Sequence, residues 1–141
     1  MRFIRQRDDH SCGPVAIINA LKWAGVPVTY RTHFRRIKRL CRTTQDWGTR
    51  REDMSKALAR YGLALRYEVR SLVTLQEMEK HLLSGSALIL EYWFREGEKY
   101  DGHYVFIYHN DDHGFMVVND MTSGQAAQPR TRKELKFGST G

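Results

Sequence analysis

The sequence has few cysteines and prolines, and it has no long hydrophobic run. Its two cysteines, Cys12 and Cys41, are too few for a disulfide scaffold, so we expect two free thiols in a reducing compartment. No apolar run approaches the roughly 20 residues that cross a bilayer. No apolar stretch follows the positive charges of residues 1–10, so we expect no secretory signal. These absences predict a cytoplasmic protein without a membrane segment.

Positive charge is what the chain has in excess. The formal net charge is +7 and the isoelectric point is about 9.6, which favours an acidic partner such as nucleic acid, an anionic surface or an acidic peptide. The hydrophobic content of 41% is ordinary for a globular protein, and 141 residues fit one domain. We predict a single domain over residues 1–141, with a core at about 3–124 and a basic tail over 125–141.

The first half of the chain carries helix start and stop signals. Pro14 is tolerated only in a first helical turn, so we expect the first helix to begin at Cys12. Thr49 and Thr74 each precede a glutamate by three residues, which predicts capping boxes at the start of two further helices. The predicted helices cover residues 12–24, 32–41, 49–61 and 74–85, and glycines are expected to end three of them, at Gly25, Gly62 and Gly85.

The second half of the chain reads as β-structure. The continuous apolar and aromatic run over residues 87–94 is suited to a central strand. Residues 103–109 and 115–119 have the pattern of a hairpin around the polar segment 110–114. Helices followed by an antiparallel sheet predict an α+β fold, with the N-terminal helices packed on a C-terminal sheet.

The hairpin brings together a histidine and a carboxylate. If Asp111 and Asp112 form the turn, His103 lies directly opposite Asp120, and a turn two residues longer makes the two diagonal neighbours on one face. Their Cβ atoms then lie within roughly 5–8 Å, on the face that carries Val105. That separation suits a carboxylate that orients an imidazole by a hydrogen bond.

Cys12 is a candidate nucleophile because of its place at a helix start. The partial positive charge of a helix N-terminus lowers the pKa of a thiol, and a nearby imidazolium lowers it further. The product would be a thiolate at neutral pH, the form that attacks carbonyl carbons.

Residues 6–14, Gln-Arg-Asp-Asp-His-Ser-Cys-Gly-Pro, resemble the nucleophile segment of the bacteriocin-processing peptidase domains. These papain-like domains stand at the front of certain ABC transporters and cut after double-glycine leaders. In that family a glutamine six residues before the cysteine helps to form the oxyanion hole, and Gln6 and Cys12 have this spacing.

The resemblance extends over about residues 3–124. Residues 102–107 are similar to the strand that begins with the family's histidine, and residues 48–63 to its middle helix and the glycine turn that follows. Residues 119–124 are similar to the segment that carries the family's aspartate, with Met121 in the place of proline.

The resemblance implies a papain-like cysteine peptidase that needs no cofactor or metal. Cys12 would attack the carbonyl carbon, His103 would take up and return the proton, and Asp120 would fix the imidazole tautomer. Gln6 and a backbone N–H at the helix start would stabilise the oxyanion, a donor typically contributing ~3–4 kcal/mol. The same residues would serve a deamidase or an amide transferase.

Other interpretations of these residues stay open. Cys12 alone could be a small buried core residue, and a zinc site with His10 lacks the usual ligand spacing. Cys41 is interpreted as a bystander, and His109 and His113 as solvated turn residues.

Residues 31–51 carry eight arginines and lysines, and Asp46 is the single acid among them. The alternative function is therefore a non-enzymatic nucleic-acid-binding protein that keeps the papain-like scaffold and uses this basic helix. For the enzyme, the same charge favours a peptide or protein substrate with an acidic segment, and the resemblance implies small residues at the cut site.

Overall fold

Helix α1 (Cys12–Trp23) is the apolar helix of the N-terminal part of the chain. In the computed structural model, which describes residues 3–8, 10–61, 68, 74–96, 99–119 and 127–130, it begins at Cys12 as predicted. Nine of its twelve residues are buried, including Ile17, Ile18 and Leu21. A helix that is buried nearly all round must have neighbours on several sides.

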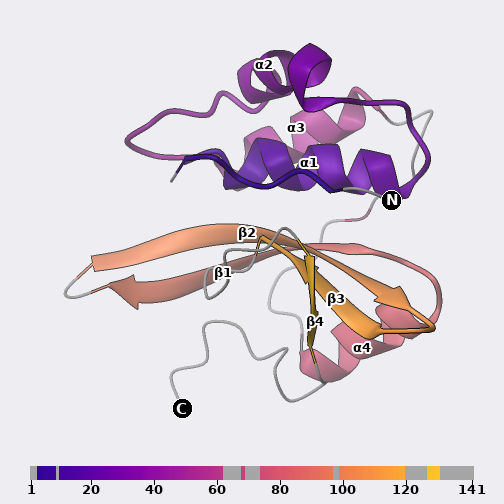
Figure 1. The fold of residues 1–141 in the computed structure, drawn as a ribbon. Coiled ribbons are helices and arrows are strands. Elements are labelled where there is room, and N and C mark those ends of the chain that lie inside the picture. Colours follow the sequence, from indigo (N-terminus) through magenta and orange to yellow (C-terminus); the bar gives the residue numbers. More distant parts are fainter. Residues whose placement is uncertain are drawn as a thin grey trace. The chain divides into compact units, whose positions relative to one another are not determined.

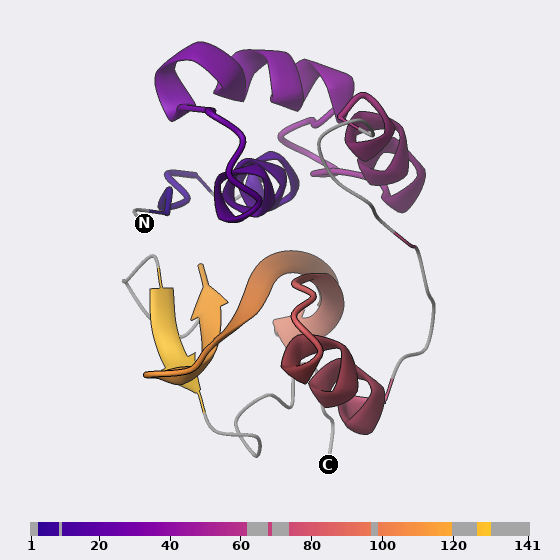
Figure 2. The same ribbon diagram turned by 90° about the vertical axis from the view of Figure 1, so that its right-hand side faces the viewer.

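Two shorter helices supply those neighbours. Helix α2 (Tyr30–Leu40) and helix α3 (Arg51–Ala59) contact α1 and each other, and Figures 1 and 2 show the three helices packed together. Gly13 of α1 has no room for a Cβ atom, which would lie 2.8 Å from Cβ of Thr49 and 2.9 Å from Sδ of Met54. The first turn of α1 is therefore in close contact with the segment that begins α3.

The starts of α2 and α3 differ from the sequence prediction. Helix α2 begins two residues early because Oγ1 of Thr29 accepts a hydrogen bond from the backbone N–H of Thr32, at 3.2 Å. The predicted capping box at Thr49 is wrong. Helix α3 begins at Arg51, its N-cap makes no side-chain hydrogen bond, and the Thr49 hydroxyl lies 2.6 Å from that of Thr43. Gly62 lies outside the described residues.

The chain divides into two compact units, Met1–Ser71 and Leu72–Gly141. In the second unit four strands form an antiparallel sheet in the order β1-β2-β3-β4, and helix α4 contacts β2 (Figures 1 and 2). The elements are α4 (Leu75–Leu83), β1 (Leu88–Glu96), β2 (Lys99–Asn110), β3 (Gly114–Val118) and β4 (Ala127–Arg130).

The order of elements confirms the predicted α+β class, and α4 begins where its capping signal lies. Oγ1 of Thr74 accepts from the backbone N–H of Glu77 at 3.1 Å, and Gly85 follows the helix with a φ of 97°. Met78 and Leu82 of α4 pack with Val105 and other apolar residues of β2 and β3 into the core of this unit. No helix within the described residues is long and apolar enough to cross a membrane.

Two predictions about the sheet are wrong. Strand β1 was expected at the centre, but among the described strands it lies at an edge and β2 is central. Strand β4 lies within residues 125–141, the segment predicted to be a basic tail.

The predicted hairpin is present, but its register is one residue off. Phe106 pairs with Val118, because three residues rather than two or four separate β2 from β3. The Asn110 side chain holds this turn by accepting from the backbone N–H of Asp112 at 2.8 Å. Gly114 closes the turn with a φ of 80°, a conformation that glycine adopts at little cost.

Candidate active site

Cys12 is the first residue of α1, and its side chain is buried, with 7% of its surface exposed. The preceding residue, Ser11, is the N-cap but makes no side-chain hydrogen bond to the helix. No acidic residue lies in the first turn. The positive end of the α1 dipole therefore acts on the thiol without a neighbouring carboxylate in that turn.

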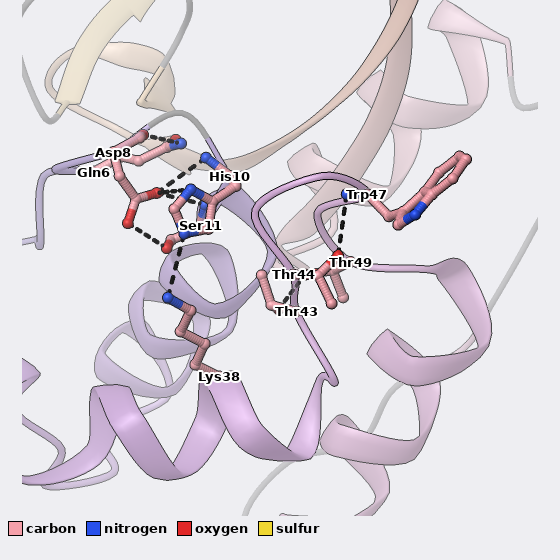
Figure 3. A network of polar contacts seen from close by, with 9 residues as sticks. All are labelled: Gln6, Asp8, His10, Ser11, Lys38, Thr43, Thr44, Trp47 and Thr49. Atoms are coloured by element: carbon pink, nitrogen blue, oxygen red, sulfur yellow. Dashed lines mark hydrogen bonds and ion pairs between the residues drawn. The ribbon is translucent and has the colours of Figure 1, made fainter.

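The loop before Cys12 is held by the carboxylate of Asp8 (Figure 3). Oδ1 accepts from the backbone N–H groups of Ser11, at 2.7 Å, and His10, at 3.0 Å, and Oδ2 accepts from the Ser11 hydroxyl at 2.7 Å. Partial burial raises the pKa of Asp8, but these hydrogen bonds and His10 more than offset it, so its pKa lies below the ordinary value. Asp8 thus holds the loop before Cys12 as an anion.

Gln6 belongs to the same loop. Its side-chain amide nitrogen donates to the backbone carbonyl of Asp8 at 2.7 Å (Figure 3). The segment that carries it is fixed to α1 by the buried side chain of Asn19, which accepts from the N–H of Ile4 at 2.7 Å and donates to its carbonyl at 3.0 Å. Gln6 and Asp8 therefore lie on one loop that leads to Cys12 and is anchored to α1.

His103 lies in β2 and is 4% exposed. Its Nε2 atom is 2.9 Å from the backbone carbonyl oxygen of Asn119, and its ring meets that of Tyr92 edge-on at 5.6 Å. A carbonyl oxygen can only accept, so Nε2 carries the proton. In the neutral imidazole the lone pair then sits on Nδ1, the nitrogen that can take a proton.

The strand register does not set Asp120, the predicted cross-strand partner of His103, opposite this histidine. Both hairpin registers that were predicted to set Asp120 on the same face as His103 are wrong, and β3 ends at Val118. Asn119 follows with a φ of 63°, which breaks the two-residue alternation of the strand. Asp120 itself lies outside the described residues.

The second thiol differs from the first in its surroundings. Cys41 is fully buried at the C-cap of α2, and burial, together with the nearby carboxylate of Asp53, raises its pKa to about 12. His113 is exposed in the turn between β2 and β3, and His109 lies beside Asp111 at 3.7 Å. Among the described residues, no three His, Cys, Asp or Glu side chains are grouped as metal ligands.

Sequence reasoning missed Asp8 and Asn19 as parts of the site. An aspartate three residues before a serine is a local turn signal that could have indicated the Asp8 loop. No local signal indicates Asn19, whose partner is 15 residues away in the chain. The structure also assigns the contact at Nε2 of His103 to a backbone carbonyl, which residue types alone cannot reveal.

Comparison with known proteins gives one family. The model of the Peptidase_C39 like family matches residues 1–138 of the chain, nearly its whole length. No curated protein and no solved structure matches. The family match indicates a peptidase with a protein substrate.

Proposed function

The chain belongs to the Peptidase_C39 like family, and from this premise we propose that it cleaves a peptide bond with Cys12 as nucleophile, His103 as base and Asp120 as the residue that orients the base. We further propose that residues 1–141 form one papain-like domain.

The observation that carries this proposal is the position of Cys12 at the first residue of α1. Backbone N–H groups at a helix start favour a negative charge, so they favour the thiolate over the thiol. The hydrogen bonds of Asp8 and Asn19 hold the segment that precedes Cys12 in one conformation. A nucleophile that must attack along a defined path requires such a fixed position.

His103 supports the proposal through its tautomer. Because Nε2–H donates to Asn119, Nδ1 is the basic nitrogen and would accept the proton of Cys12. The imidazolium that forms would keep its Nε2–H bond and would gain stability from the negative charge of Asp120, one residue beyond the carbonyl.

The reaction would run in two stages. The Cys12 sulfur attacks the carbonyl carbon, and the oxyanion is stabilised by the amide of Gln6 and a backbone N–H of the helix start. The imidazolium of His103 gives its proton to the leaving amine, and a thioester remains on Cys12. Water, deprotonated by His103, then hydrolyses the thioester and frees the thiol.

Gln6 can serve the oxyanion while keeping its present bond. A primary amide has two N–H donors, and one of them binds the carbonyl of Asp8. We propose that the other N–H donates to the oxyanion when substrate binds. The bond to Asp8 would then hold the side chain in position.

A peptide library treated in H₂¹⁸O tests the proposal. We expect the wild type to produce new C-termini that carry ¹⁸O, and Cys12→Ala to produce none, since only hydrolysis introduces a water oxygen into the new carboxylate. A reaction that requires Cys12 but yields amide-linked products would show an amide transferase, and conversion of glutamine to glutamate would show a deamidase. Cleavage that persists in Cys12→Ala would contradict the proposal.

A further inference from the structure

A basic groove lies on the N-terminal unit, between α2, the loop at residues 43–50 and the start of α3. Its volume is about 860 Å³. Among the described residues its lining contains two carboxylates, Glu52 and Asp53, and the latter is buried. Against them stand six cationic side chains, Arg35, Lys38, Arg39, Arg42, Arg50 and Lys56. The groove therefore has the charge of a site for an anionic ligand.

One large aromatic side chain projects at this groove. The indole of Trp47 is 78% exposed, although it sits on a well-defined loop (Figure 3). Thr44 and Gly48 exchange backbone hydrogen bonds of 3.0 and 2.8 Å across the loop, and the backbone N–H of Trp47 donates to Oγ1 of Thr44 at 3.1 Å. An exposed indole on a backbone that is already fixed loses little conformational freedom on binding, and tryptophan and arginine are enriched at binding surfaces.

The groove is connected to the nucleophile through direct contacts. The Thr43 hydroxyl lies 2.6 Å from that of Thr49, and Thr49 packs so closely on Gly13, the residue after Cys12, that no Cβ would fit there. On the other side of the groove, Nζ of Lys38 lies 3.3 Å from Nε2 of His10, two residues before Cys12 (Figure 3). A ligand in the groove would therefore lie beside the loop and helix turn that position the thiol.

We propose that this groove binds an acidic segment of the protein substrate next to the bond that is cut, with arginines pairing to its carboxylates and Trp47 covering one of its apolar side chains. The inference rests on the proposed function, because it treats the occupant as substrate. Arginine suits this role because its planar guanidinium pairs with carboxylates through two hydrogen bonds.

An acidic peptide fits the groove better than single-stranded nucleic acid. Proteins that bind such strands stack successive bases on several aromatic side chains, whereas Trp47 is the single aromatic residue in the described lining. The carboxylate of Glu52 would oppose a continuous phosphate backbone, while spaced acidic side chains can avoid it. The contacts to the first turn of α1 are also expected of a substrate site.

Binding is measured on the full chain carrying Cys12→Ala, so that no turnover intervenes. The probe is a fluorescein-labelled peptide of alternating glutamate and leucine, followed by fluorescence anisotropy. Arg35→Glu with Arg39→Glu should raise the Kd by at least ~10-fold, and Trp47→Ala should raise it by ~5-fold. The matched control is Arg31→Glu with Arg36→Glu, two exposed arginines of the same helix outside the groove lining.

The control should change the Kd by less than ~2-fold, although it alters the net charge equally. Equal weakening by both pairs would show that net charge alone governs binding and would overturn the proposal. Tighter binding of labelled oligothymidylate than of the peptide would also overturn it, in favour of a nucleic-acid site. Since the assay needs no catalysis, a wild type without peptidase activity, together with intact, groove-dependent binding, would refute the proposed function and leave the groove as an acidic-peptide site.

Discussion

The two cysteines of this chain lie at opposite ends of helices. Cys12 is the first residue of α1, and Cys41 is the C-cap of α2. Both are buried, so burial does not distinguish them. The helix ends do distinguish them, because Cys12 lies at the positive end of the α1 dipole and Cys41 lies at the negative end of the α2 dipole.

The neighbouring charges reinforce this difference. The carboxylate of Asp53 helps to raise the pKa of Cys41 to about 12, after burial as the larger cause. The one carboxylate on the loop before Cys12, among the described residues, is that of Asp8, and its oxygens are engaged by Ser11 and His10. The two thiols therefore differ in the helix end at which they lie and in the carboxylate nearest to them, and the proposed function assigns the nucleophile to Cys12.

The largest expected effect separates the two thiols by activity. Cys12→Ala should lower kcat/KM for peptide cleavage by at least ~10³-fold, because the nucleophile is lost. Cys41→Ala should leave kcat/KM within ~2-fold and cost about 1 kcal/mol of unfolding free energy through the small cavity that it leaves. For both variants, kcat/KM is measured with a library peptide that the wild type cleaves, and the free energy of unfolding is measured with urea. A comparable loss of activity in the two variants would erase the proposed distinction.

A smaller effect is expected where α1 meets the segment before α3. Gly13→Ala places a Cβ 2.8 Å from that of Thr49, so we expect a loss of about 2 kcal/mol in unfolding free energy and slower alkylation of Cys12. The control is Gly25→Ala at the other end of α1, where a φ of 84° strains an alanine but no atom lies within 4 Å.

The control should lose about 1 kcal/mol of stability without changing the alkylation of Cys12. Urea unfolding and mass spectrometry of iodoacetamide-treated protein measure the two quantities. If Gly13→Ala leaves the reactivity of Cys12 unchanged, the packing of Thr49 does not position the thiol.

The smallest effect concerns the Asp8 loop and depends on pH. The folded-state pKa of Asp8 is lowered from 3.8, so its stabilising contribution is present above that value and is lost as the pH falls through the folded-state pKa. Asp8→Asn keeps one oxygen acceptor but cannot accept from the Ser11 hydroxyl with its nitrogen. The variant should therefore be less stable than the wild type at neutral pH.

Urea midpoints of the wild type and Asp8→Asn between about pH 6 and pH 2 test this linkage. We expect the gap between the two proteins to close at the acid end, and kcat/KM at neutral pH to fall ~5-fold in the variant. A gap that stays constant with pH would show that the charge of Asp8 does not hold the loop.

Local signals predicted those parts of the fold that depend on neighbouring residues. Pro14 fixed the start of α1, and Thr74 fixed the start of α4. The capping signal failed at Thr49, because the Thr49 hydroxyl bonds to Thr43 across a loop. No local rule can indicate that this bond replaces the cap. The α+β class followed from the order of the elements alone.

The candidate site was less accessible to sequence reasoning. The choice of Cys12 and His103 followed from residue types and order, but the register of the hairpin did not. The Asn110 side chain stabilises a three-residue turn, and this turn shifts the pairing of β2 with β3 by one residue. The bond from His103 to the Asn119 carbonyl depends on that register. Strand β4 was missed because its short sequence, which contains Pro129, has no strand pattern.

The central claim is that Cys12 and His103 form a reactive pair, and site-resolved alkylation tests it most directly. Iodoacetamide rates at Cys12 and Cys41 would be measured by mass spectrometry from about pH 5 to pH 10 in the wild type, in His103→Ala and in the matched control His109→Ala. We predict that Cys12 reacts well below the ordinary thiol pKa of about 8.5 and at least ~100-fold faster than Cys41, and that only His103→Ala removes this advantage. A Cys12 that titrates like Cys41, or that reacts equally with and without His103, would contradict the account.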